Sequence, residues 1–147
     1  AGLSMGGYGA WRMALHRPER FSCAASLSGP LDFVQRVQGS RSGESAGPYC
    51  WEAIFENPDA IKGTDADLFA LAEKRIAEGR VMPRLYQTIG IEDFHYERNQ
   101  TARKRMTQLG LAPTYAEHPG GHNWEYWNAH IPDVLTWLPL TESTVAE

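Results

Sequence analysis

The stretch Gly2-Leu3-Ser4-Met5-Gly6, near the start of the sequence, decides how the rest of the chain is interpreted. It has the pattern G-x-S-x-G, in which a serine occupies a sharp turn between a strand and a helix with its hydroxyl exposed. Side chains at Gly2 or Gly6 are expected to crowd the backbone beside the serine. Taken alone, so short a pattern also arises by chance, as a flexible glycine turn with an ordinary serine.

The residues after this turn have the apolar spacing of a helix, which the pattern requires. Apolar residues recur at helical intervals from Tyr8 to His16, and the run ends before Pro18. Such a helix would direct its N-terminal dipole and free N–H groups toward negative charge that develops near Ser4. The backbone N–H of Met5 is therefore the expected first donor of an oxyanion hole.

Strands and helices alternate along the rest of the chain. The predicted strands cover residues 21–29, 83–90 and 113–118, and the predicted helices cover residues 68–79 and 98–109. A last helix carries an apolar face and an internal Pro132, which is expected to kink or restart it; the face consists of Trp127, Ile131, Val134, Leu135 and Leu138. This alternation predicts an α/β fold with a parallel sheet, and ligands beyond the carboxyl ends of its strands.

The length of 147 residues and the apolar content of 42% predict one domain, residues 1–147. Within it, residues 31–62 lose clear periodicity and collect Gly, Ser and Pro, which predicts a cap-like excursion that selects the substrate. The sequence begins at Ala1, inside a motif. We therefore expect the C-terminal portion of a longer fold whose N-terminal strands are missing.

A serine hydroxyl needs a neighbouring base, and that base needs an acceptor to orient it. Asp93 follows the strand that ends at Gly90, and His122 follows the strand that ends at His118. The two loops leave the same end of a parallel sheet. The sequence thus predicts Ser4 as nucleophile, Asp93 as acid and His122 as base.

Other residues compete for these roles. Glu92 is adjacent to Asp93 but is expected to point elsewhere, and His95 is expected at the surface. His118 would lie within a strand. His16 and His130 fall on helices, where packing or contact with solvent is the commoner fate of a histidine.

Three separated segments carry a resemblance to a known family: Gly2 to Ala10, Gly90 to Phe94, and Pro119 to Trp127. Together they resemble the esterase D and tributyrin-esterase branch of the α/β-hydrolases. The resemblance spans nearly the whole chain and implies the α/β-hydrolase fold, with the three roles assigned as above.

Members of that branch are serine carboxylesterases that act on short acyl esters, including acetylated or feruloylated carbohydrates. The resemblance therefore implies an acyl-enzyme mechanism without a metal or organic cofactor. One departure is Asn123, where many relatives have an aspartate. Another is the absence of the strands before Gly2, among which the family has a loop that donates the second oxyanion N–H.

Aromatic residues near the motifs are expected to line an acyl pocket, with core packing as the alternative; they are Tyr8, Trp51, Phe94 and Trp124. The expected partner is a small-molecule ester. An acyltransferase, a serine peptidase of the same superfamily, and an inactive binding module remain alternatives. A bare strand edge near Ala24 to Leu27 would favour a homodimer.

Composition excludes several other classes. The net charge is −4, and the short basic run of residues 103–105 is expected to be a solvated helix face, so nucleic-acid binding is not expected. No apolar stretch approaches the about 20 residues that span a bilayer, so a soluble protein is expected. Cys23 and Cys50 form no metal pattern, and Cys23 is expected to be a buried thiol. The compartment is left unknown, with the cytoplasm as the default expectation.

Overall fold

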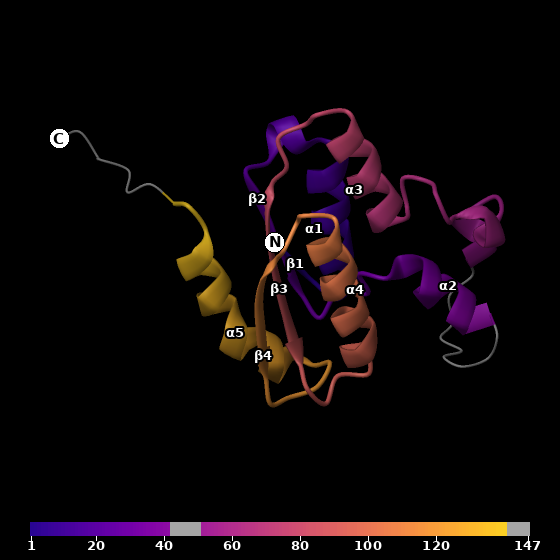
Figure 1. The fold of residues 1–147 in the computed structure, drawn as a ribbon. Helices are drawn as coiled ribbons and strands as arrows, with labels where there is room; N and C mark the ends of the chain where they lie inside the picture. The colour runs from indigo at the N-terminus through magenta and orange to yellow at the C-terminus, as the bar shows by residue number, and fades with distance from the viewer. Residues whose placement is uncertain (42–50, 141–147) are drawn as a thin grey trace.

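The computed structural model describes residues 1–41 and 51–140 (Figure 1). The sheet in these residues has four parallel strands in the order β1-β2-β3-β4; they are β1 (Gly2–Leu3), β2 (Cys23–Leu27), β3 (Arg84–Gly90) and β4 (Thr114–His118). The prediction of a parallel sheet is confirmed. The additional strand, β1, has only two residues, too few to form a recognisable pattern.

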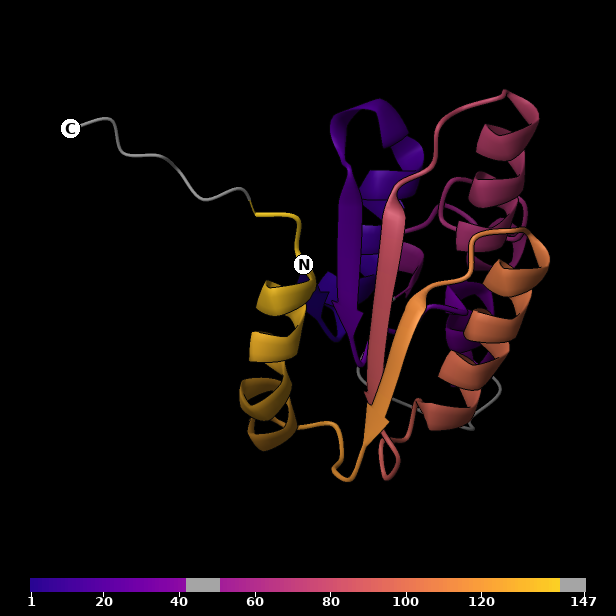
Figure 2. The ribbon, with the colours of Figure 1, turned by 60° about the vertical axis from the view of Figure 1, so that its left-hand side comes forward.

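Helices cover both faces of the sheet, as Figure 2 shows, with α5 on one face and α1, α3 and α4 on the other. Their bounds are α1 (Met5–His16), α2 (Phe33–Arg41), α3 (Leu68–Ala77), α4 (Tyr96–Gln108) and α5 (Trp124–Trp137). Short 3-10 turns occur at η1 (Pro18–Arg20), η2 (Trp51–Ala53) and η3 (Pro58–Ala60).

Each face of the sheet has its own hydrophobic core, because successive strand residues point to opposite faces. Ala24 and Leu85 belong to the larger core, with residues from α1, α3 and α4. Ala25 and Tyr86, the next residue along each strand, belong to the smaller core under α5. The two layers therefore hold the carboxyl ends of the strands in fixed positions.

Residues 31–62 contain a helix, α2, that the sequence analysis did not predict. It offers few apolar residues, of which Phe33 and Val37 are buried. Phe33 stacks on Tyr8 with the ring centroids 4.1 Å apart, so the helix is stabilised by contact with α1 rather than by its own pattern. Residues 42–50 of this predicted excursion lie outside the described residues, as does Cys50.

The last helix differs from its prediction in two ways. It continues through Pro132 without a restart. Because proline has no N–H, the carbonyl of Asn128 loses its helical hydrogen-bond donor, but Asn128 is an exposed residue. Its predicted apolar face is only partly buried: Val134 is fully buried, whereas Leu135 is 53% exposed and Ile131 is 37% exposed. Ile131 lines an apolar hollow of about 290 Å³ beside β1.

The predicted bare edge of β2 is shorter than expected. β1 pairs with Ser26 and Leu27, so only the first part of β2, from Cys23, lacks a strand neighbour on that side within the described residues. The homodimer stays a prediction. Cys23 is a half-buried free thiol rather than a buried one.

Among the described residues, no helix combines the length and the hydropathy needed to cross a membrane.

Candidate active site

Ser4 lies between the last residue of β1 and the first residue of α1. Its φ of 50° and ψ of −127° are values that few non-glycine residues adopt, at a cost on the order of 1–3 kcal/mol. The Ser4 N–H donates to the Leu27 carbonyl (2.8 Å), and the Ser4 carbonyl accepts from the Gly7 N–H (2.9 Å). Hydrogen bonds on both sides thus hold the strained turn that G-x-S-x-G predicts.

Close packing around this turn explains two of its glycines. A Cβ at Gly2 would overlap the Gly6 carbonyl, as the sequence analysis expected. The same expectation for Gly6 is wrong, because a Cβ there would meet nothing within 4 Å. The crowded position is Gly7 instead, where a Cβ would lie 2.5 Å from the hydroxyl oxygen of Ser26 on β2.

Three side chains meet in series beyond the carboxyl ends of the strands. The Oγ of Ser4 lies 2.8 Å from Nε2 of His122, and Nδ1 of His122 lies 2.8 Å from Oδ2 of Asp93. If Nδ1 donates its proton to the carboxylate, Nε2 is left as the acceptor for the serine hydroxyl. The structure thus brings together the three residues to which the sequence analysis assigned a nucleophile, a base and an acid.

The loops that carry Asp93 and His122 are joined by reciprocal hydrogen bonds. The Glu92 N–H donates to the Gly120 carbonyl (3.1 Å), and the Glu92 carboxylate accepts the Gly120 N–H. A Cβ at Gly90 would overlap the Gly120 carbonyl, so the loops can approach this closely only without a side chain there. The Glu92 carboxylate is bound to the Gly120 N–H, and Glu92 thus couples the two loops.

Asp93 is buried, with 4% of its surface exposed. Burial alone would raise the pKa of Asp93, but hydrogen bonds from the His122 ring and the His95 backbone N–H lower it. The charge of His122 and the hydroxyl of Ser28 act in the same direction, and the net pKa lies below its ordinary value. Asp93 is therefore a carboxylate at neutral pH and able to orient His122.

His95 is also buried, at 4% exposure, so its predicted place at the surface is wrong. Its backbone N–H donates to Oδ1 of Asp93 (2.8 Å), and the turn formed in this way places its ring near His122, with centroids 5.5 Å apart. Burial lowers the pKa of His95 to about 4 against the opposing charge of Asp93, and the charges of His122, Arg36 and Arg98 lower it further. The ring beside His122 is therefore uncharged at neutral pH.

A buried pair of amide side chains, which the sequence analysis missed, supports this turn. Nε2 of Gln87 donates to Oδ1 of Asn99 (2.9 Å), and Nδ2 of Asn99 donates to the carbonyls of Gly29 and His95 (both 3.0 Å). Gln87 and Asn99 are both completely buried. A glutamine inside a strand of a predicted parallel sheet covered by helices was the available signal, since buried amides need partners.

A cavity of about 280 Å³ opens beside Ser4. It is lined by Ser4, Met5, Pro30, Arg36, Trp51, Phe94, His95 and His122. Trp51 is 3% exposed and Phe94 is 63% exposed, so one forms an inner wall and the other part of the rim. Both of these predicted substrate contacts therefore lie at the cavity.

The other two predicted substrate contacts do not line it. Tyr8 belongs to the larger core, where its hydroxyl donates to the Ala66 carbonyl (2.8 Å); its position on the buried side of α1 is the physical reason. Trp124 is 65% exposed and lines the hollow beside β1 instead. It is held there by an edge-on contact with Trp127 on the next turn of α5, with the ring centroids 5.4 Å apart.

The start of α1 faces the cavity through Met5. The first N–H groups of a helix have no acceptor within the helix, and they form the positive end of its dipole. The backbone N–H of Met5 is therefore suited to stabilise an oxyanion next to Ser4. The residues His118, His130 and Asp133, whose ligand atoms lie close together, do not line this cavity.

Comparison with known proteins relates this arrangement to a family. The chain matches the family model named Esterase over residues 1–138. It is 30% identical over 141 residues to an acetyl esterase of Caldicellulosiruptor saccharolyticus, an alignment that covers 93% of this chain and 52% of that protein.

Two solved structures from Staphylococcus aureus are similar to it. An S-formylglutathione hydrolase shares 30% identity with a TM-score of 0.79, covering 92% of this chain and 52% of that one. The fluorophosphonate-binding serine hydrolase F shares 31% identity with a TM-score of 0.81, covering 92% and 51%. The chain thus spans about half the length of the relatives it matches.

These matches confirm the predicted resemblance to the esterase D-like branch of the α/β-hydrolases. The chain belongs to the Esterase family and has the α/β-hydrolase fold.

Proposed function

We propose that the protein is a serine carboxylesterase that hydrolyses short-chain acyl esters through an acyl-enzyme. The observation that carries the proposal is the continuous series of two 2.8 Å contacts from Ser4 through His122 to Asp93. A hydroxyl, an imidazole and a buried carboxylate in this order form the relay that activates a serine.

In the first half of the reaction, Nε2 of His122 takes the hydroxyl proton as Oγ of Ser4 forms a bond to the ester carbonyl carbon. The carbonyl oxygen becomes an oxyanion, and the Met5 N–H donates to it. His122 then gives its proton to the leaving alkoxide as the ester C–O bond breaks. Asp93 stabilises the imidazolium throughout and does not itself take the proton.

In the second half, water replaces the alcohol. His122 removes a proton from the water, whose oxygen attacks the acyl carbon, and the serine oxygen leaves with the proton that His122 returns. The products are a carboxylic acid and the free enzyme.

The cavity supports the choice of a short acyl group. Its volume of about 280 Å³ is close to the lower limit of small-molecule sites, and Trp51 walls its inner side. The acetyl esterase among the relatives supports the same class. Acetyl or feruloyl esters of carbohydrates are the proposed natural substrates, with the aromatic ring of a feruloyl group placed against Phe94 at the rim.

The test is covalent labelling followed by kinetics. A fluorophosphonate probe should label the purified protein at Ser4 and should not label Ser4→Ala, whereas Ser22→Ala, a matched change at an exposed serine, should be labelled normally. The kcat/KM for nitrophenyl acetate should exceed that for nitrophenyl octanoate. Labelling of Ser4→Ala at the wild-type rate would refute the assignment, and an acyl group recovered on a sugar acceptor instead of as free acid would refute the hydrolase.

A further inference from the structure

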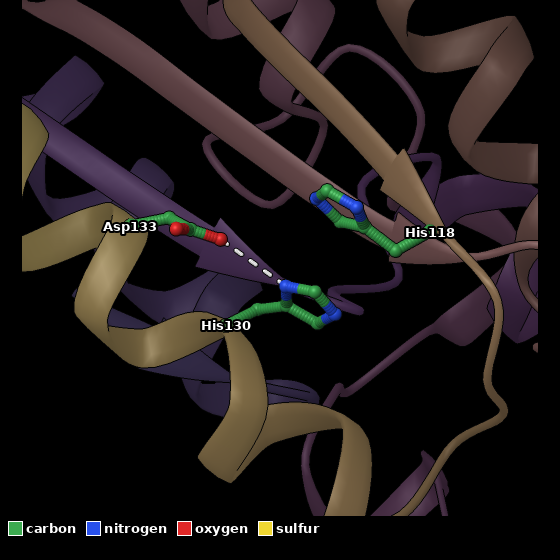
Figure 3. A group of neighbouring side chains, drawn as sticks. All are labelled: His118, His130 and Asp133. Carbon is green, nitrogen blue, oxygen red and sulfur yellow. Dashed lines mark hydrogen bonds and ion pairs between the residues drawn. The ribbon is translucent and has the colours of Figure 1, made fainter.

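Two histidines and an aspartate meet on the sheet face that α5 covers, away from Ser4. They are His118, His130 and Asp133, and one ligand atom from each lies within 4.8 Å of the others (Figure 3). His118 is the last residue of β4, while His130 and Asp133 are three residues apart on α5. The group thus joins a strand to the helix that packs on it.

The two imidazole rings lie face to face, with centroids 3.9 Å apart and an angle of 8° between the planes. Nδ1 of His130 is 3.1 Å from Oδ2 of Asp133. In Figure 3 this carboxylate faces the ring edges that carry nitrogen atoms. Nε2 of His118 is buried and has no hydrogen-bond partner among the described residues.

These distances suit a small dication. Ligand atoms bound to zinc at about 2.0–2.1 Å in a tetrahedron are about 3.3 Å from one another. The separation of 3.1 Å between His130 and Asp133 is already close to this value, so an ion could replace the proton that joins them. His118 would have to approach by at most about 1.5 Å, and the stacked rings of His118 and His130 would have to tilt toward each other, because an imidazole binds a metal ion in the plane of its ring.

The donor set selects the class of metal. Two neutral imidazole nitrogens and one carboxylate suit zinc and its transition-metal neighbours, whereas calcium and magnesium prefer oxygen ligands alone. The side chain of Asp133 is 50% exposed and that of His130 is 17% exposed, which leaves room for water as a further ligand. The buried nitrogen of His118 gains a partner when the ion binds.

We propose that His118, His130 and Asp133 form a binding site for a divalent transition metal of the zinc class, which clips the end of β4 to α5. The loop between these elements carries His122. The ion would therefore close both ends of the segment that holds the imidazole next to Ser4, and it would stabilise the fold without contact with a substrate.

The test measures zinc binding to the protein after removal of any affinity tag and treatment with a chelator. Calorimetric titration should give one zinc ion per chain, and 100 Kd of zinc should raise the Tm by about 5–10 °C. His130→Gln and Asp133→Asn should each weaken binding about 10-fold or more. The exposed position of Asp133 keeps this test valid if a histidine variant fails to fold.

Two controls locate the ion. His16 lies 3.2 Å from Asp65 in an exposed pair, a matched His–Asp contact, and His16→Gln should bind zinc like the wild type. His122→Gln should also retain binding, which separates this site from the residues around Ser4. Unchanged affinity in Asp133→Asn, or loss of binding in His122→Gln, would overturn the proposal, and neither result depends on esterase activity.

Discussion

The low pKa of His95 predicts a specific loss of stability in acid. Its pKa is about 4 in the folded protein and 6.5 for an ordinary histidine. Below pH 6.5 the unfolded chain therefore takes up a proton at His95 that the folded protein excludes. The contribution of the neutral His95 to the free energy of unfolding is thus fully present above pH 6.5 and is lost as the pH falls toward 4. At about 1.4 kcal/mol per pKa unit, the full contribution is about 3–4 kcal/mol.

The comparison that isolates His95 is between the wild type and His95→Leu, which replaces a buried ring by a non-titrating apolar side chain. Urea unfolding would be measured for both proteins at about pH 7 and about pH 4.5. Between these two pH values, the free energy of unfolding of the wild type should fall by about 2–3 kcal/mol more than the free energy of unfolding of the variant.

All other ionisable residues are the same in both proteins, so the difference isolates the change at position 95. Asp93 also has a lowered pKa, and its contribution is lost only below the ordinary carboxyl value of 3.8, outside the measured range. Equal losses in the two proteins, within about 0.5 kcal/mol, would refute the conclusion that burial holds His95 neutral.

Three further predictions test the site and its supports. Asp93→Asn should lower kcat by about 10⁴-fold while circular dichroism stays unchanged, because His122 loses the acceptor that sets its tautomer; activity within about 10-fold of wild type would contradict this role. Gly90→Ala should separate the two loops that carry Asp93 and His122, and it should lower both the Tm and kcat. The control is Gly9→Ala on α1, where a Cβ meets nothing within 4 Å; this change should raise the unfolding free energy by about 0.5–1 kcal/mol. Similar thermal scans for the two variants would contradict the proposed contact between the loops. Oδ1 of Asn123 caps α5 by accepting the Tyr126 N–H (2.9 Å). Asn123→Ala should therefore lower the free energy of unfolding, measured by thermal denaturation, by about 1 kcal/mol, whereas Asn123→Asp should change it very little. Equal Tm values for the two variants would count against the cap.

The sequence was sufficient to predict the residues that meet at the site because their positions follow from chain order. A glycine-flanked serine before a helical pattern specifies the turn, and Asp93 and His122 each follow a predicted strand. Parallel strands deliver such loops to one edge, so no knowledge of packing is needed to bring them together. Asn123 illustrates the limit of the pattern, since only its hydrogen bond to Tyr126 reveals its role as a cap.

Packing between distant segments decided the rest. β1 is defined by its pairing with Ser26 and Leu27, and His95 is buried in a turn that its N–H bond to Asp93 and the Asn99 side chain hold together. Tyr8 lies on the buried side of α1 and packs in the core against Phe33, a residue of an unpredicted helix.

The cluster of His118, His130 and Asp133 depends in the same way on how α5 docks against β4. Local spacing along the chain thus determined the turn and the order of the reacting groups. Which side chains are buried, paired or placed in the cavity follows from long-range contacts, whose energies no short stretch of sequence contains.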